Sequence, residues 1–366
     1  MFGLSQKQVE QKLASFQDPC LNTNYIVSKA IRKIEITVEL LSVEIELGYP
    51  LAGIRADIEQ ALTTLLEPIA GDRKVRVQVS WNIKAQKPQK ELPSLSNVKN
   101  VIAVASCKGG VGKSTTAVNL ALALSAEGAS VGILDADIYG PSQAMLLGVD
   151  NKTRPEPYDD KCWRPIRAHG IQAMSMAFLL EDNDAPMVWR GPMVSGALQQ
   201  LITQTKWHDL DYLIIDMPPG TGDIQLTLSQ KIPVTGSVIV TTPQDIALLD
   251  ARKGIEMFRK VEIPVLGIVE NMSVHICSQC GHSEPIFGQG GGAGIAEKYD
   301  TRLLGQLPLS MTIRERSDSG TPILVTDPDG EISQIYRSVA RNLSAVLSQR
   351  AAAGTGAFPK ITIDDN

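Results

Sequence analysis

The 366-residue chain is 43% hydrophobic and 20% charged, a composition typical of a globular protein of roughly two to three domains. Its formal net charge of −5 and its lack of a basic block argue against nucleic acid as a partner. No apolar run approaches the ~20 residues of a membrane span, and residues 1–7 lack the apolar core of a signal peptide. We therefore expect a cytoplasmic protein with no nucleic-acid or membrane partner. The five cysteines are too scattered for a disulfide framework.

The N-terminal part of the chain has the pattern of a small α+β domain. Alternating apolar residues change parity within residues 34–47, which predicts two strands separated by a turn near 40–41. Helical spacing over 54–65 and a further alternating stretch over 75–81 complete a β-β-α-β order. We expect this domain to span residues 1–84.

A segment rich in Lys, Gln, Pro and Ser, residues 85–99, has no periodicity and is interpreted as a linker. After it, apolar strands alternate with helical stripes, which is typical of a mainly parallel sheet covered by helices on both faces. The expected strands are residues 101–106, 130–135, 212–217, 237–242, 265–271 and 303–307. We expect this α/β domain to span 100–350, with an amphipathic helix over 332–348 covering the sheet and a flexible tail over 351–366.

A glycine-rich turn connects the first of these strands to a helical stripe. Residues 107–115 read Cys-Lys-Gly-Gly-Val-Gly-Lys-Ser-Thr, and glycines allow consecutive backbone N–H groups to converge on an anion at a helix N-terminus. This pattern predicts a nucleotide phosphate site, with Lys113 against the β- and γ-phosphates and the Ser114 hydroxyl on Mg²⁺. Thr115 is expected near the α-phosphate. The residues that this pattern predicts to bind nucleotide are Gly109, Gly110, Val111, Gly112, Lys113, Ser114 and Thr115.

Carboxylates stand at the ends of two further strands, where ligands bind in open α/β sheets. Asp216 follows an apolar run and is expected to hold Mg²⁺ through water, opposite Ser114. The Pro-Pro-Gly-Thr-Gly stretch after it fits a switch loop whose Gly220 amide senses the γ-phosphate, with a plain connecting turn as the alternative. Asp135 and Asp137 end the other strand, where an Asp-rich turn is the alternative.

A Cys-x2-Cys pair, Cys277 and Cys280, lies in the C-terminal third of the chain. Two thiolates are half of what a [4Fe–4S] cluster or a closed Cys₄ zinc site needs, and the remaining cysteines are isolated in the sequence. A two-fold dimer that contributes two thiolates from each chain would complete such a site. An intrachain zinc site that includes His275 or His282, and a redox dithiol, also fit this spacing.

Taken together, these motifs resemble the Mrp-type iron–sulfur cluster carriers, which belong to the deviant-Walker P-loop ATPases. The resemblance rests on the N-terminal α+β domain, the Lys-Gly-Gly-Val-Gly-Lys-Ser loop at 108–114, the Asp135 and Asp216 segments, Trp-Arg-Gly-Pro-Met at 189–193, Glu-Asn-Met-Ser at 270–273, and the Cys277/Cys280 pair. It implies a homodimeric ATPase that binds a [4Fe–4S] cluster at the subunit interface and transfers it to apo-proteins. Hydrolysis of ATP is then slow and secondary to carriage.

The resemblance also implies roles for individual residues. Lys108, which precedes the glycine pair, reaches the phosphates of the partner subunit, and the segment from Asp135 is switch I. Within it, Asp137 orients the attacking water and Asp135 supports the Mg²⁺ shell, while Lys108, Lys113 and Asp137 form the catalytic set. Asn271 reads the adenine base, with the backbone near Pro308 as a wall, and the choice of ATP over GTP rests on this resemblance.

Three further classes of protein share parts of this pattern. A partition- or division-site-type positioning ATPase has the same deviant loop, but the Cys pair and the lack of a strongly basic terminal helix argue against it. An electron-donating reductase like the nitrogenase iron protein also bridges a cluster between subunits. An ATP-binding zinc regulatory protein would use the same cysteines for a different metal.

Overall fold

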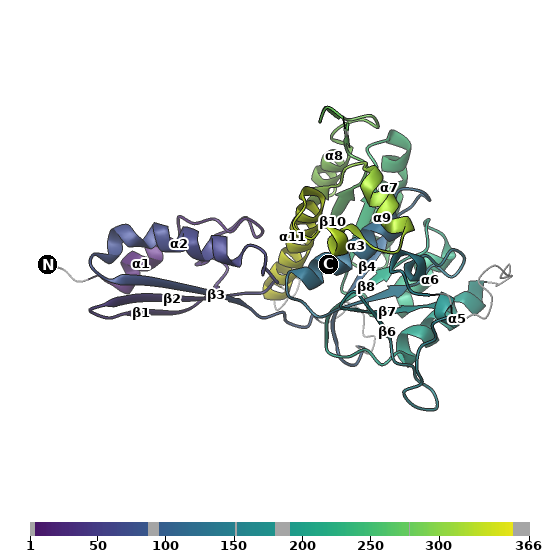
Figure 1. The fold of residues 1–366 in the computed structure, drawn as a ribbon, viewed down its shortest axis with the longest axis horizontal. Helices are drawn as coiled ribbons and strands as arrows, with labels where there is room; N and C mark the ends of the chain where they lie inside the picture. Colours follow the sequence, from purple (N-terminus) through teal and green to yellow (C-terminus); the bar gives the residue numbers. More distant parts are fainter. Residues whose placement is uncertain (1–3, 87–94, 151, 180–190, 278, 354–366) are drawn as a thin grey trace, which may run out of the picture. The chain divides into compact units, whose positions relative to one another are not determined.

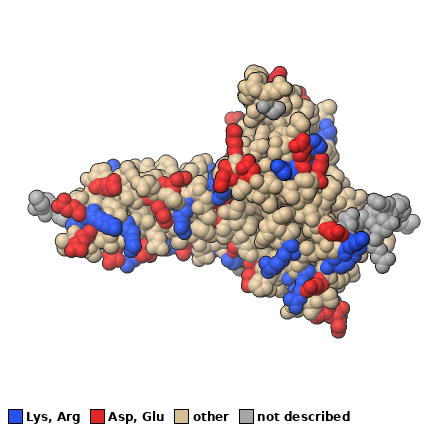
Figure 2. Space-filling view, viewed as in Figure 1, with Lys and Arg blue, Asp and Glu red and all other residues tan. Residues whose placement is uncertain are grey.

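The structure is a computed structural model of the chain, and it describes residues 4–86, 95–150, 152–179, 191–277 and 279–353. The chain forms two compact units, one comprising residues 1–84 with 344–366 and the other residues 85–343 (Figure 1). On the face shown in Figure 2, Lys and Arg side chains are interspersed with Asp and Glu on both units. No described helix is long and apolar enough to cross a membrane.

The N-terminal unit packs helices on one small sheet. Its elements in chain order are α1 (Gln6–Leu13), β1 (Ile31–Ile36), β2 (Leu40–Leu47), α2 (Arg55–Ala70) and β3 (Lys74–Trp81). The sheet order is β1-β2-β3, with β1 antiparallel and β3 parallel to β2. The predicted α+β class is confirmed, and α1 is an additional helix that the sequence analysis did not predict.

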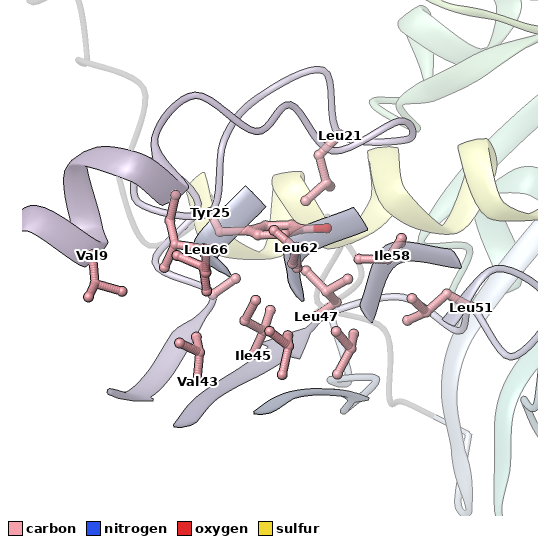
Figure 3. Packing of buried hydrophobic residues seen from close by; sticks show 14 of the residues in the cluster. Val9, Leu21, Tyr25, Val43, Ile45, Leu47, Leu51, Ile58, Leu62 and Leu66 are labelled. Atoms are coloured by element: carbon pink, nitrogen blue, oxygen red, sulfur yellow. The ribbon is translucent and has the colours of Figure 1, made fainter. Parts of the chain in front are cut away.

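The core of this unit follows the periods of its elements. Alternate residues of β2, among them Val43 and Ile45, are buried on one face of the sheet, because successive side chains of a strand point to opposite faces. They pack in one cluster with Ile58, Leu62 and Leu66, which lie four residues apart on α2 (Figure 3). The buried stripe of the helix and the buried face of the strand together form this core.

The turn between β1 and β2 differs from its predicted position. Thr37 N donates to Leu40 O at 2.8 Å, and Leu40 N donates to the Thr37 hydroxyl at 2.9 Å. The turn therefore closes before Leu40, and β2 begins at the residue where the apolar alternation had suggested a turn.

The large unit is built on a mainly parallel sheet. Its strands are β4 (Val98–Ala105), β5 (Val131–Asp135), β6 (Ile166–Ala168), β7 (Ile171–Ser175), β8 (Leu210–Asp216), β9 (Gly236–Thr241), β10 (Val265–Glu270) and β13 (Leu303–Gln306). Within the described residues the order is β13-β10-β9-β4-β8-β5-β7-β6, and only the β6–β7 pair is antiparallel. All residues of β5 and β9 are buried, so both faces of the sheet are covered, as predicted.

Helices connect these strands and cover the sheet (Figure 1). They are α3 (Lys113–Ala126), α4 (Gln143–Leu146), α5 (Gly191–Gln204), α6 (Asp223–Lys231), α7 (Asp245–Lys260), α8 (Gly291–Lys298), α9 (Met311–Asp318), α10 (Ile323–Thr326) and α11 (Glu331–Ala353), with a short 3-10 helix at Met176–Phe178. The two short strands β11 (His275–Ile276) and β12 (Ser283–Glu284) form a separate hairpin.

The end of α11 differs from the predicted domain boundary at residue 350. Residues from Ser344 onward belong to the N-terminal unit, where Ala345 is part of the buried core and Gln349 Nε2 donates to Leu21 O at 2.7 Å. Only the first part of this helix covers the large sheet. Most of the tail predicted to be flexible, from residue 354 on, lies outside the described residues.

Candidate functional site

The predicted phosphate loop lies between the end of β4 and the first residue of α3, Lys113. Gly110 and Gly112 have positive φ values of 82° and 81°, which side-chain-bearing residues rarely adopt. A Cβ atom on Gly112 would also collide with the side-chain amide of Asn271. The sequence therefore needs glycine at this position both for the backbone conformation and for the close approach of Asn271.

The sheet topology brings the predicted carboxylates next to this loop. Asp216 at the end of β8 pairs in register with Val104 of β4 on one side and with Asp135 of β5 on the other. Asp216 is fully buried and forms an ion pair with the ammonium of Lys113, which is itself buried. Lys113 Nζ also lies 3.1 Å from the Ser114 hydroxyl. Lysine, hydroxyl and carboxylate thus meet at one point.

Asp135 is held by donors from three segments. Its Oδ2 accepts from Ser142 N at 2.9 Å and from the Ser175 hydroxyl at 3.2 Å, and its Oδ1 accepts from Asp137 N at 3.1 Å. Burial, and then the neighbouring charge of Asp216, raise the pKa of Asp135 to about 7. Burial also raises the pKa of Asp137. Both carboxylate oxygens of Asp135 thus accept hydrogen bonds from the protein itself.

Gln143 is a site residue that sequence reasoning missed. It is the first residue of α4 and is 1% exposed, and its Nε2 donates to Asp216 Oδ2 at 2.8 Å and to Ser114 O at 3.1 Å. Its backbone N–H donates to Asp135 Oδ2 at 3.0 Å. A glutamine eight residues after a strand-end aspartate carries no recognisable signal in the sequence, because only the fold brings it to Asp216.

The loop after β8 contacts the phosphate loop. Gly220 N donates to Ser106 O at 2.9 Å, and Gly220 has a positive φ of 106°. The amide predicted to sense the γ-phosphate is thus bonded to the strand end that leads into the phosphate loop. A contact of this amide with phosphate would require this hydrogen bond to break.

Asn271, predicted to read the base, follows β10 and lies against the phosphate loop. Its Nδ2 donates to Val111 O at 2.8 Å, and its backbone N donates to Thr241 O at 2.7 Å. Pro308 is buried and follows Leu307, whose N donates to Glu270 O at 2.8 Å. Asn271 and Pro308 are therefore on neighbouring strand ends, beside the phosphate loop.

Glu270 is a second residue that sequence reasoning did not assign. It is fully buried, and its carboxylate accepts from the backbone N of Gly292, at the start of α8, and from Gln306 Nε2. The chain leaves the sheet after Glu270, and at Gly292 it is again bound to the side chain of this same residue. The positive end of the α8 dipole stabilises the buried carboxylate.

The Cys277/Cys280 pair lies in the tight turn of the β11–β12 hairpin. Cys277 N donates to His282 O and Gly281 N donates to Cys277 O, both at 2.9 Å. The backbone N–H groups of Cys280 and then Gln279 lower the pKa of the Cys277 thiol. In the described part of the chain, neither flanking histidine nor any acidic residue joins the pair in a set of three metal ligands.

The remaining loop residues differ in exposure. Lys108 is half-buried, whereas Gly109 and Gly110 are exposed. Cys107 packs against Gly254 of α7, and burial raises the pKa of its thiol to about 12. Cys107 is therefore a packed residue at the strand end.

A glycine loop between a buried strand and a helix beginning with Lys-Ser, with carboxylates at the ends of neighbouring parallel strands, defines a P-loop NTPase. Two family models match the chain. A model described as NUBPL iron-transfer P-loop NTPase matches residues 97–344, and one described as iron–sulfur cluster assembly protein matches residues 6–79. The chain therefore belongs to the family of NUBPL iron-transfer P-loop NTPases.

Relatives extend this similarity to nearly the whole chain. Over 335 residues the chain is 54% identical to the iron–sulfur cluster carrier protein of Escherichia coli strain K12, covering 92% of this chain and 90% of the relative. It is 63% identical over 279 residues to the protein of the same name from Pseudomonas fragi, covering 76% and 97% of the two chains.

Solved structures show the same fold. The nucleotide-binding protein of Archaeoglobus fulgidus, in complex with ADP, is 36% identical with a TM-score of 0.57, covering 66% of this chain and 93% of that one. The Pyrococcus furiosus cell division ATPase MinD is 21% identical with a TM-score of 0.51, covering 67% and 98%, and shows similarity of fold alone. The predicted family resemblance and fold class are thus confirmed.

Proposed function

We propose that this protein carries an iron–sulfur cluster as its cargo, binds it through Cys277 and Cys280, and transfers it to apo-proteins. The observation that carries the proposal is the cysteine pair in the tight turn of an exposed hairpin, with backbone N–H groups directed at the Cys277 sulfur. These N–H groups favour the thiolate, which is the form that binds iron. The iron–sulfur cluster carrier relatives support the same function.

The cargo we propose is a [4Fe–4S] cluster bound between two copies of the chain. Such a cluster takes four thiolates, and the described residues of one chain offer two adjacent cysteines with no third metal-binding side chain. A two-fold axis through the cluster supplies the missing pair. The exposure of Cys280 allows a partner chain to approach it.

ATP binding is proposed at the phosphate loop, with Lys113 moving from Asp216 to the phosphates. The Ser114 hydroxyl and Asp216 supply hard oxygen atoms of the kind that Mg²⁺ prefers, and Asp135 supports them. Bound Mg²⁺ supplies neutralisation of phosphate charge. We assign adenine recognition to Asn271 beside Pro308.

ATP hydrolysis is proposed to be slow, and to control the binding and transfer of the cluster rather than to drive them. Asp137 orients the attacking water, and the Gly220 amide exchanges its hydrogen bond with Ser106 for one to the γ-phosphate. Lys108 completes the site of the partner subunit, so that a second cation reaches the phosphates only in the dimer.

The test is anaerobic reconstitution of the purified chain with iron and sulfide, followed by metal and sulfide analysis and an absorption spectrum. We expect about four iron and four sulfide per dimer. The variants Cys277→Ala and Cys280→Ala are each expected to lose the cluster and to retain nucleotide binding, because the hairpin lies outside the phosphate loop.

Cys162→Ala is the matched control, since Cys162 is a half-buried free cysteine away from the hairpin, and it is expected to keep the full complement. A full complement of iron in either hairpin variant would refute the site. Zinc in place of iron in the anaerobically purified protein would favour a zinc regulatory protein instead.

A further inference from the structure

One buried side chain, Gln143, joins three parts of the nucleotide site. Its Nε2 donates to Asp216 Oδ2 at 2.8 Å and to Ser114 O at 3.1 Å. Both of these partners only accept hydrogen bonds, so the amide nitrogen must face them and the orientation of the amide is fixed by chemistry. Its backbone N–H donates to Asp135 Oδ2, which attaches it to the switch I segment.

The oxygen of this amide is a buried acceptor. Gln143 Oε1 is inaccessible to solvent and has no hydrogen-bond partner in the described part of the chain. The oxygen and nitrogen of an amide are about 2.3 Å apart, so Oε1 lies within about 5 Å of Asp216 Oδ2. Buried polar atoms in native proteins are nearly always satisfied, so this oxygen is free to accept a hydrogen bond from a donor that the described part of the chain does not supply.

Water bound to Mg²⁺ is a hydrogen-bond donor of the kind that this oxygen lacks. Mg²⁺ releases its waters reluctantly and keeps several of them in protein sites. Ser114 and Asp216, the residues assigned to the metal, are the same residues that Gln143 contacts. Metal sites are commonly supported by groups that orient the ligands and bind their waters.

We propose that Gln143 is a positioning residue of the magnesium site, holding Asp216 Oδ2 through its Nε2 and accepting a hydrogen bond from a metal-bound water through its Oε1. The inference rests on the proposed nucleotide function and deepens it. Lys113 holds the second oxygen of Asp216, and this bond ends when the lysine moves to the phosphates. Gln143 then keeps the carboxylate in the same orientation.

The attachment to Asp135 gives this role a second consequence. The backbone N–H groups of Ser142 and Gln143 both bind Asp135 Oδ2, so a movement of switch I moves the Gln143 amide relative to Asp216. Metal binding and the state of switch I are therefore coupled through one residue, whose backbone N–H binds Asp135 and whose side chain binds Asp216.

The test measures Mn²⁺ binding to the full-length chain in the presence of saturating ADP, by electron paramagnetic resonance. The variant is Gln143→Met, because the methionine side chain has a volume similar to that of glutamine but no amide. Gln143→Ala also removes the amide and replaces this variant if Gln143→Met does not fold. We expect Mn²⁺ affinity to fall about 10- to 100-fold, the usual effect of losing a supporting residue of a metal site. ADP affinity in EDTA should change less than about twofold.

Gln172→Met is the matched control. Gln172 is another buried glutamine, 4% exposed, but both atoms of its amide bind the backbone of His208, away from the site. Unchanged Mn²⁺ affinity in a folded Gln143 variant, or an equal loss in Gln172→Met, would overturn the role of Gln143. The role of Gln143 would also be overturned if the wild-type chain bound ADP in EDTA but showed no Mn²⁺ site. If the wild-type chain bound no ADP at all, the proposed nucleotide function itself would be overturned.

Discussion

Two thiols close to the candidate sites have opposite tendencies to ionise. The Cys277 sulfur receives backbone N–H groups, which stabilise its negative charge and lower its pKa. The Cys107 sulfur is packed under α7, where burial disfavours the charge and raises the pKa to about 12. Cys107 is therefore the less reactive of the two thiols, and Cys277 is the one whose thiolate is favoured.

This difference predicts selective alkylation by iodoacetamide in the apo-protein. At pH 8, a thiol with a pKa of about 12 is thiolate in only about one molecule in 10⁴, so we expect Cys277 to react at least about 100-fold faster than Cys107. The Cys107 rate should rise about tenfold per pH unit between pH 7 and 10, while the Cys277 rate levels off. Peptide mass spectrometry measures both rates.

The control is the same reaction in concentrated urea, where the two environments are lost and the rates should become similar. Equal rates in the folded protein would contradict the assigned environments.

At the scale of elements, the cysteine hairpin is part of an excursion from the sheet that comprises residues 271–292. This excursion starts directly after Glu270 and ends at Gly292, whose backbone N–H binds the buried Glu270 carboxylate. Glu270 precedes Asn271, and its side chain binds Gly292 N at the start of α8 and Gln306 of β13. Its backbone carbonyl accepts from Leu307 N, next to Pro308. One residue thus fixes the base of the excursion and the strand ends assigned to the nucleotide base.

We predict that Glu270→Ala loosens this excursion. It removes a charged acceptor from two donors, and hydrogen bonds to charged groups contribute about 1.5–3 kcal/mol each. Hydrogen exchange measured by mass spectrometry should become faster over residues 271–292 and remain unchanged over β1 to β3. Faster exchange here with unchanged exchange in β4 would indicate local rather than global opening.

Glu284→Ala is the control, since Glu284 is an exposed glutamate of the same excursion, on β12. Equal protection in Glu270→Ala and wild type would show that the carboxylate does not hold the excursion.

At the scale of the whole molecule, two features remain incomplete in one chain. The hairpin provides two thiolates where a [4Fe–4S] cluster needs four. Lys108 is half-buried next to the exposed glycines of the phosphate loop, and its assigned target is the nucleotide of a second subunit. The proposed dimer would satisfy both requirements and would link cluster binding to the proposed catalytic site.

We therefore predict that Lys108→Ala uncouples hydrolysis from assembly. The specific ATPase activity of the wild type should rise with protein concentration as dimers form, because the second lysine then stabilises transition-state charge. The variant should bind ATP with affinity within about threefold of wild type and hydrolyse it at least about tenfold more slowly, with no dependence on concentration. Lys99→Ala, a surface lysine paired with Asp211, is the control. Full turnover in Lys108→Ala would refute the role across the interface.

The sequence by itself determined the features that are encoded in contiguous residues. The glycine loop, the carboxylates after apolar runs and the Cys-x2-Cys spacing are local patterns whose geometry follows from backbone chemistry. The six predicted strands of the large sheet are all present. The last two strands at one end of the sheet, β7 and the edge strand β6, were missed because they are short and joined by a tight turn at His169 and Gly170.

Only the tertiary structure decided which distant side chains meet. Gln143 reaches Asp216 across 73 positions, and Asn271 reaches Val111 across 160, because the order of parallel strands places their ends side by side. Likewise, the amphipathic pattern of α11 predicts a buried face but not its partner, and Ala345 near the end of this helix packs in the core of the N-terminal unit. Periodicity specifies that a surface is buried, and only the fold specifies against what.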